Sequence, residues 1–88
     1  NPGSCNIQSM IFIITLATIF MKMDIIDALC SSTYIPSKLL NVDNVCGSIE
    51  EGKSADIIVW DIYEPIQIPY HFSTSPIKSV IKSGKIIF

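Results

Sequence analysis

The sequence predicts an α/β chain with helices in its first half and strands in its second. Residues 10–40 contain apolar runs of helical length, whereas residues 57–88 contain short runs rich in Ile and Val between Gly and Pro. Of the 88 residues, 49% are hydrophobic and 16% are charged, with a mean hydropathy of +0.47. So short a chain lacks the polar residues to cover itself. We therefore expect it to be one piece of a larger fold.

The first helix is expected over residues 9–23, around the apolar run MIFIITLATIFM at 10–21. Many of its residues are β-branched, so periodicity alone leaves a strand as the alternative, and the length of the run favours a helix. This run of 12 residues falls short of the ~20 that span a bilayer. Neither the basic start nor the cleavage site of a signal peptide is present. We expect a helix buried on most sides by neighbours that this chain barely supplies.

Two shorter helices are expected next. Asp24 is a suitable N-cap for a helix over residues 25–31, with Asp27 at the position of a capping-box acid. Pro36 can begin the other helix, over residues 36–40, because its missing N–H is harmless in a first turn. Residues 41–44 then break the helical region.

The second half of the chain is expected to form strands. A turn at Glu51-Gly52-Lys53 precedes a run at residues 56–62 that is rich in Ile and Val and is typical of a buried strand. Two prolines mark a polar connection at residues 65–69. Residues 79–88 predict a hairpin with Ser83-Gly84 as its two-residue turn, where glycine readily takes the positive φ.

Charge and cysteine content exclude several functions. The net charge is −2 and the six lysines form no cluster, so a nucleic-acid partner is not expected. Cys5, Cys30 and Cys46 have no CxxC spacing and no adjacent histidine. We expect free thiols rather than a disulfide framework or a zinc site.

The most informative motif is GSIEEGKSADIIVWD at residues 47–61. It resembles the C-terminal signature G-x-I-x-x-G-x-x-A-D-[IL]-[VI] of the amidohydrolase superfamily. The resemblance implies the C-terminal piece of a metal-dependent (β/α)8 barrel and part of the small β-sandwich beside it. Residues 1–45 would be the last helical part of the barrel domain and residues 46–88 the C-terminal sandwich strands. In that signature Asp56 pairs with local backbone to start a strand.

Two further stretches narrow the resemblance. NPGS at residues 1–4, followed by MKM at 21–23, is similar to the segment after the last barrel strand in the imidazolonepropionase family. PYHF at 69–72, followed by a strand at 80–87, is similar to that family's tail. The resemblance implies metal-dependent hydrolysis of 4-imidazolone-5-propanoate to N-formimidoyl-L-glutamate, a cytoplasmic step of histidine degradation. It also implies zinc or iron, whose ligands would lie outside these residues, and leaves a homodimer open.

The resemblance carries three substrate-binding residues over to this chain: Asn1, Gly3 and Ser4. An Asn amide both donates and accepts, glycine lets backbone approach closely, and a serine hydroxyl at a helix entrance suits a carboxylate. The family's metal-binding Asp would lie two residues before Asn1. We expect no catalytic or metal-binding residue within the chain, and therefore no ring opening by the chain alone. The alternative for Asn1 and Ser4 is a turn or capping role.

Other features are interpreted as structural. His71 is the only histidine, and we expect it in a loop on the sandwich side rather than at a metal. Tyr34-Ile35-Pro36 departs from the Asn-Ala-Ala run usual in the family, which places bulky groups at a tight packing site and predicts a shifted third helix. The alternatives are another cyclic amidohydrolase or deaminase, and a non-enzymatic apolar interaction module. The expected partners are a small-molecule substrate and the remainder of the parent chain, without a membrane.

Overall fold

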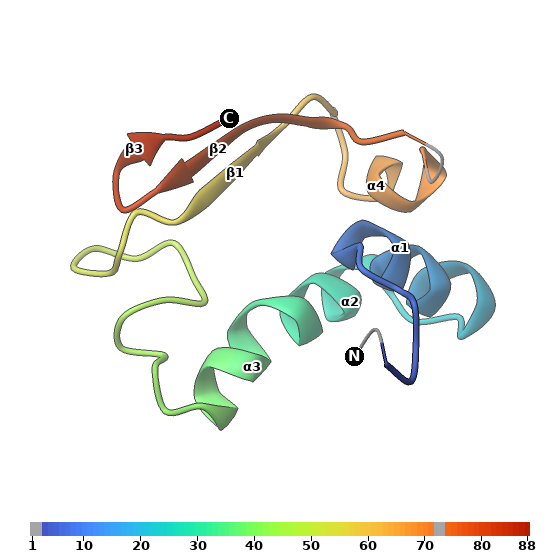
Figure 1. Cartoon of the computed structure of the whole chain (residues 1–88), viewed down its shortest axis with the longest axis horizontal. Coiled ribbons are helices and arrows are strands. Elements are labelled where there is room, and N and C mark those ends of the chain that lie inside the picture. Colours follow the sequence, from blue (N-terminus) through green and yellow to red (C-terminus); the bar gives the residue numbers. More distant parts are fainter. Residues whose placement is uncertain (1–2, 72–73) are drawn as a thin grey trace.

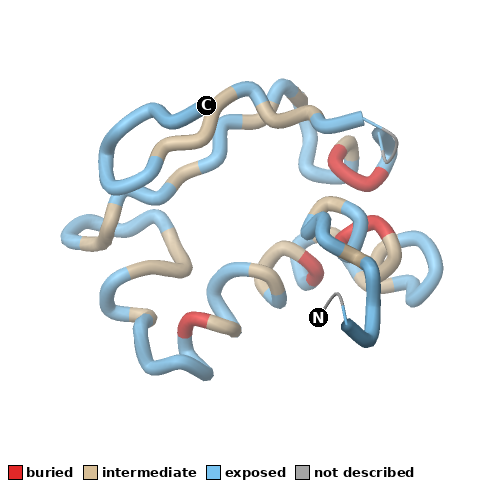
Figure 2. The backbone as a smooth tube through the Cα atoms, in the orientation of Figure 1, coloured by how far each residue is buried: buried red, intermediate tan, exposed pale blue. Residues whose placement is uncertain are grey.

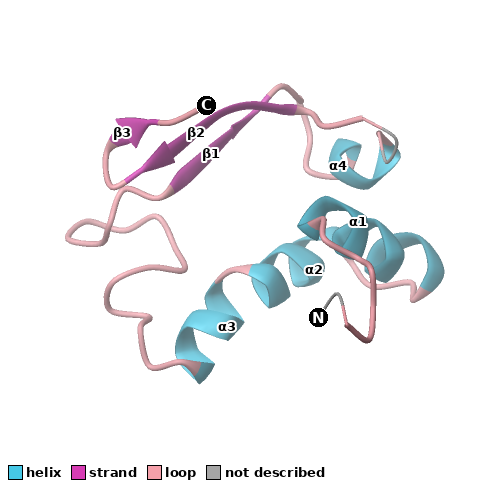
Figure 3. Ribbon diagram, viewed as in Figure 1, coloured by secondary structure: helices cyan, strands magenta, loops and turns pink. Residues whose placement is uncertain are grey.

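The computed structural model describes residues 3–71 and 74–88 and confirms an α/β arrangement (Figures 1 and 3). A helical group lies on one side and a three-stranded antiparallel sheet on the other. The helical elements are α1 (Met10–Thr15), the π-helix η1 (Leu16–Phe20), α2 (Ile25–Ser32), α3 (Tyr34–Leu39) and α4 (Gln67–Tyr70). The strands are β1 (Ile57–Trp60), β2 (Ile77–Lys82) and β3 (Lys85–Ile86).

The first predicted helix is confirmed, but its second half is wound as a π-helix. Ser9 is the N-cap, and the helix ends at Phe20 rather than at residue 23. The hydroxyls of Thr15 and Thr18 each donate to the carbonyl four residues earlier, at 2.8 Å. Such back-bonding competes with the backbone ladder and distorts helices. Lys22, with a φ of 55°, lies just past the end of the helix.

The two shorter helices also form. Asp24 caps α2, as predicted, by accepting from the backbone N–H of Ile26 at 2.9 Å. The prediction that α3 begins at Pro36 is wrong, because the helix begins two residues earlier, at Tyr34. A proline fits there because the N–H groups of a first turn have no partner within the helix. Thr33 (φ −131°, ψ −75°) separates the two helices. Pro36 has no N–H to donate to the carbonyl four residues earlier, so α2 does not run on as one ladder.

The sheet has the order β1-β2-β3. Ile57 pairs with Ile81, and the register shifts between Val59 and Trp60. The predicted hairpin is confirmed: β2 and β3 are joined by the two-residue turn Ser83-Gly84, with φ values of 51° and 80°. Positive φ at both positions is the pattern of a type I′ turn, whose twist matches that of the strands.

The prediction of a buried strand over residues 56–62 is wrong in both length and burial. Strand β1 covers only Ile57–Trp60, and Ile58 and Val59 are 45% and 39% exposed. None of the three strands contains a buried residue, and Figure 2 shows no red along them. The reason is that no second layer covers the sheet within the described residues.

The predicted polar connection at residues 65–69 is also corrected. Residues 67–70 form the short helix α4, in which Ile68 and Pro69 are fully buried. The helix packs against α1 and η1. The two prolines suggested a loop, but Pro65 precedes the helix, and Pro69 lies in its first turn, where a missing N–H is tolerated.

The core is small. Ile14, Ala28 and Ile68 form it, and Trp60 from β1 packs against it with other half-buried side chains. The radius of gyration is 13.7 Å, above the roughly 12 Å expected for a packed domain of this length. Large side chains such as Phe20 and Met21 are 74% and 71% exposed. The described residues therefore leave most of the apolar surface uncovered, as the composition predicts.

Candidate functional site

The predicted substrate-binding residues lie at the beginning of the chain. Gly3 and Ser4 form an exposed turn, and Asn1 lies outside the described residues. Residues 5–9, which follow the turn, form neither helix nor strand, and the first helix begins only at Met10. The expectation that Ser4 stands at a helix entrance is therefore wrong. Its hydroxyl would meet a ligand as part of a turn.

A cleft of about 920 Å³ lies between the helices and β1. Its lining is mainly apolar and includes Ile11, Ile14, Leu29, Leu40, Ile57 and Trp60. Gln8 and Ser9, which follow the N-terminal turn, also line it. Ser32, Thr33, Ser37, Ser48, Ser54 and Ser75 contribute hydroxyls.

The cleft has little capacity for acid–base chemistry. Among the described residues that line the cleft, Cys46 and Asp56 are the two with a thiol or a carboxyl group. The Cys46 thiol lies 3.6 Å from the carbonyl of Val42, and the Asp56 carboxylate is held by the β2–β3 turn. A general base needs to be within reach of a substrate proton and free to take it. The cleft is therefore better suited to binding an apolar group than to catalysing a reaction.

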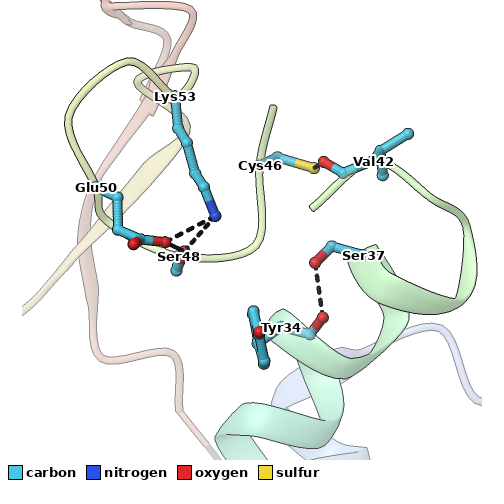
Figure 4. A network of polar contacts seen from close by, with 7 residues as sticks. All are labelled: Tyr34, Ser37, Val42, Cys46, Ser48, Glu50 and Lys53. Carbon is cyan, nitrogen blue, oxygen red and sulfur yellow. Dashed lines mark hydrogen bonds and ion pairs between the residues drawn. The ribbon is translucent and has the colours of Figure 1, made fainter. Parts of the chain in front are cut away.

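One wall of the cleft depends on a close contact between Gly47 and α3. A Cβ atom at Gly47 would lie 2.2 Å from the Ser37 hydroxyl oxygen and 2.6 Å from the Ser37 Cβ. Gly47 also has a φ of +98°. Ser37 is 4% exposed and donates to the Tyr34 carbonyl at 2.6 Å (Figure 4). The first glycine of the motif thus brings the motif's loop against α3, a contact that the sequence did not predict.

The same loop carries a polar cluster of Ser48, Glu50 and Lys53 (Figure 4). The Lys53 ammonium lies 2.8 Å from the Glu50 carboxylate and donates to the Ser48 hydroxyl at 2.7 Å. The Ser48 hydroxyl in turn donates to Glu50 at 2.5 Å. The hydrogen bond from Lys53, with that from Ser48, holds the pKa of Glu50 below its usual range. These three groups satisfy one another and hold the turn around Gly52.

Asp56 contacts residues that are farther along the chain than predicted. Its carboxylate lies 2.7 Å from the Lys82 ammonium and accepts from the Ser83 backbone N–H at 2.9 Å. The expectation that Asp56 pairs with local backbone is therefore corrected, because Ser83 is 27 residues away. The hydrogen bond from Lys82, followed by that from Ser83, lowers the pKa of Asp56. Asp56 thus joins the start of β1 to the hairpin turn.

The described residues contain no group of three or more His, Cys, Asp or Glu side chains that could hold a metal ion. The metal that the resemblance implies does not fit these residues. His71 is exposed after α4, with its ring in edge contact with Tyr70 at 5.2 Å. Cys5, Cys30 and Cys46 are free thiols. Among the described residues, no helix has the length and apolar character needed to cross a membrane.

Comparison with known proteins decides the family. The pattern of the Amidohydrolase family matches residues 3–87. The chain belongs to the amidohydrolase family. It is similar over its whole length to the imidazolonepropionase of Kosmotoga olearia, with 41% identity. The imidazolonepropionases of Shewanella putrefaciens and Bacillus mycoides are each 33% identical to it, over 99% and 100% of this chain.

The amidohydrolase chain spans about a fifth of the length of these curated relatives, 22% for Kosmotoga olearia and 21% for the other two. The family assignment confirms the resemblance read from residues 47–61. It implies a barrel in the complete fold, of which the described residues are a small α/β piece. The contacts of Gly47 and Asp56 show what two motif residues do locally. Both hold loops in place.

Proposed function

We propose that this chain is the C-terminal part of an imidazolonepropionase. The complete enzyme would hydrolyse 4-imidazolone-5-propanoate to N-formimidoyl-L-glutamate in histidine degradation. The single observation that carries the proposal is the similarity of the whole chain to imidazolonepropionases, among them that of Kosmotoga olearia with 41% identity over 88 residues. In this reaction water is consumed, one ring C–N bond breaks, and the open product is released.

The exposure of apolar side chains supports a role within a larger polypeptide. Leu39, Ile49 and Phe88 are 77%, 83% and 70% exposed. Each such side chain would contribute about 1.5–3 kcal/mol if another segment covered it fully. Another segment could likewise cover the apolar cleft and the single-layered sheet. We propose that residues 1–45 complete the barrel domain and that residues 46–88 supply strands of the β-sandwich.

In the proposed enzyme, Asn1, Gly3 and Ser4 bind the substrate. The exposure of the turn at Gly3 and Ser4 leaves it accessible to a ligand. A serine hydroxyl can donate to the propionate carboxylate, and a glycine allows the ligand close to the backbone. The binding role would thus place this turn, rather than the apolar cleft, at the substrate.

Zinc or iron is the proposed cofactor, held by residues other than those described. Such an ion lowers the pKa of a bound water and so supplies a nucleophile near neutral pH. The residues of this chain would orient the substrate and take no part in the proton transfer. We propose a cytoplasmic enzyme whose partners are its small-molecule substrate and, as a homodimer, a second copy of the complete polypeptide.

The test is a turnover assay on the full-length polypeptide that contains these residues. We expect 4-imidazolone-5-propanoate to lose its ring absorbance and to yield N-formimidoyl-L-glutamate, with activity lost on chelation and restored by zinc or iron. Turnover of a different cyclic amide, or ammonia release from an aminated ring, with no action on the imidazolone, would instead support another amidohydrolase or a deaminase.

A further inference from the structure

Helix α4 is the element that links the strands to the helices. Among the described residues, its Cα atoms come within 8 Å of those of α1 and η1, whereas no helix of residues 1–45 comes that close to a strand. The chain leaves the helices after α3, forms β1, and returns to them at α4 before it enters β2 (Figure 1). By sequence α4 lies between two strands, but by packing it belongs to the helical group.

The core is shared between the two halves of the chain. Ile14 and Ala28 come from the helices of residues 1–45, Ile68 comes from α4, and all three side chains are buried. Trp60, at the end of β1, and Ile62, just after it, are half-buried and pack against the same core. Within the described residues, neither half has a buried apolar core of its own.

Gln67, the first residue of α4, fixes the segment between β1 and α4. Its side-chain oxygen accepts hydrogen bonds from the backbone N–H groups of Tyr63, at 2.6 Å, and Glu64, at 2.9 Å. A helix of four residues is too short to be stable by itself in water. These hydrogen bonds and the burial of Ile68 against α1 therefore stabilise it. The strands are thus connected to the helices through a short, fixed segment rather than a flexible linker.

We propose that α4 couples the two halves of this chain, so that they unfold as one unit, with Ile68 as the coupling residue. This inference rests on the division of the proposed enzyme into a barrel part, residues 1–45, and a sandwich part, residues 46–88. Domains of one chain move relative to each other unless their interface is large and apolar. Here, separating the halves would expose Ile14 and Ile68 together, which is unfavourable. Gly47 also approaches Ser37, but neither residue belongs to the core.

The test is amide hydrogen exchange in the full-length polypeptide, measured for residues 10–20 and for residues 77–82. We expect Ile14→Ala to raise the exchange rate about tenfold or more in both segments, because a cavity in the shared core destabilises both. Ile68→Ala should do the same. Ile35→Ala is the matched control, since the side chain of Ile35 is 47% exposed and lies outside the core. It should leave the exchange of residues 77–82 within about twofold.

A double variant tests whether the coupling runs through α4. In an Ile68→Ala background, Ile14→Ala should have little further effect on residues 77–82, because the contact between the halves is already lost. If the Ala variants fail to fold, Ile14→Val and Ile68→Val serve instead, with expected rises of about two- to tenfold in both segments.

If Ile14→Ala raises exchange in residues 10–20 and leaves residues 77–82 unchanged, the halves open independently and the coupling role of α4 is wrong. An equal effect of Ile35→Ala on residues 77–82, or a full effect of Ile14→Ala in the Ile68→Ala background, would also overturn it. Exchange is measured without substrate, so the two proposals fail separately. Independent opening in an active enzyme would overturn the coupling alone, whereas coupled opening without imidazolone turnover would overturn the proposed function alone.

Discussion

The contact between Gly47 and Ser37 makes Gly47→Ala the most informative stability variant. The new Cβ would lie 2.2 Å from the Ser37 hydroxyl oxygen and 2.6 Å from its Cβ. The Ser37 hydroxyl cannot move aside freely, because the side chain is buried and donates to the Tyr34 carbonyl. The substitution must therefore move either the loop or α3.

The expected loss has two parts. An L-residue at the positive φ of Gly47 costs about 1–2 kcal/mol, and forcing a close-packed contact apart costs about 1–3 kcal/mol. We expect Gly47→Ala to lower the free energy of unfolding by about 2–5 kcal/mol. Gly52→Ala is the matched control. Gly52 has a φ of +90° but nothing within 4 Å of its new Cβ, so it should lose only the first part, about 1–2 kcal/mol.

The measurement is urea-induced unfolding of the full-length polypeptide, followed by circular dichroism. In a Ser37→Gly background, which removes the two nearest atoms and leaves the Thr33 carbonyl oxygen 3.3 Å from the new Cβ, the effect of Gly47→Ala should fall toward that of Gly52→Ala. Such a change in one variant's effect by the other is the signature of a direct contact. The reasoning would be refuted if Gly47→Ala and Gly52→Ala destabilised equally, or if Ser37→Gly left the effect of Gly47→Ala unchanged.

Three further predictions concern pH, binding and the isolated chain. The hydrogen bonds from Lys82 and Ser83 lower the pKa of Asp56 in the folded state, so the stability they give is present above the unfolded pKa of about 3.9 and lost as pH falls through the folded value. Urea titrations at several pH values across this range should show that the free energy of unfolding falls more steeply with decreasing pH for the unmodified protein than for Asp56→Asn. If the free energy of unfolding depended on pH equally in both proteins, the role of Asp56 would be contradicted. In the full-length enzyme, Ser4→Ala should raise KM more than it lowers kcat, as expected for a lost binding contact, and unchanged kinetics would exclude Ser4 from binding. The 88 residues alone should open no imidazolone ring even with zinc or iron added, and metal-dependent turnover above background would refute this.

Local features were the most predictable part of the fold. The Ser83-Gly84 turn and the Asp24 cap each depend on a few neighbouring residues, and both form as expected. Features that depend on distant residues were missed. The sequence around Pro69 indicated a loop, yet the burial of Ile68 against α1 stabilises a helix there. The π-winding of η1 likewise was not evident from its apolar pattern.

For the candidate site too, the sequence indicated one part and missed another. The motif at residues 47–61 was enough to indicate the family, and the family match confirms it. The local roles of its residues were not predictable, because they depend on contacts across the chain. Asp56 reaches a turn 27 residues away, and Gly47 approaches a helix that precedes it. A signal existed for Gly47, since a residue without a side chain is what such an approach needs, but the sequence does not identify the atom that it approaches.

By itself, the sequence determined the order of the first three helical segments and of the strands, the Asp24 cap and the Ser83-Gly84 turn, and an apolar surface too large for 88 residues to cover. These follow from short-range backbone preferences and from composition. Only the tertiary structure decided which apolar residues are buried, where the cleft lies, and what the motif's Gly and Asp contact. Those properties depend on distances between residues far apart in the chain, which no local pattern encodes.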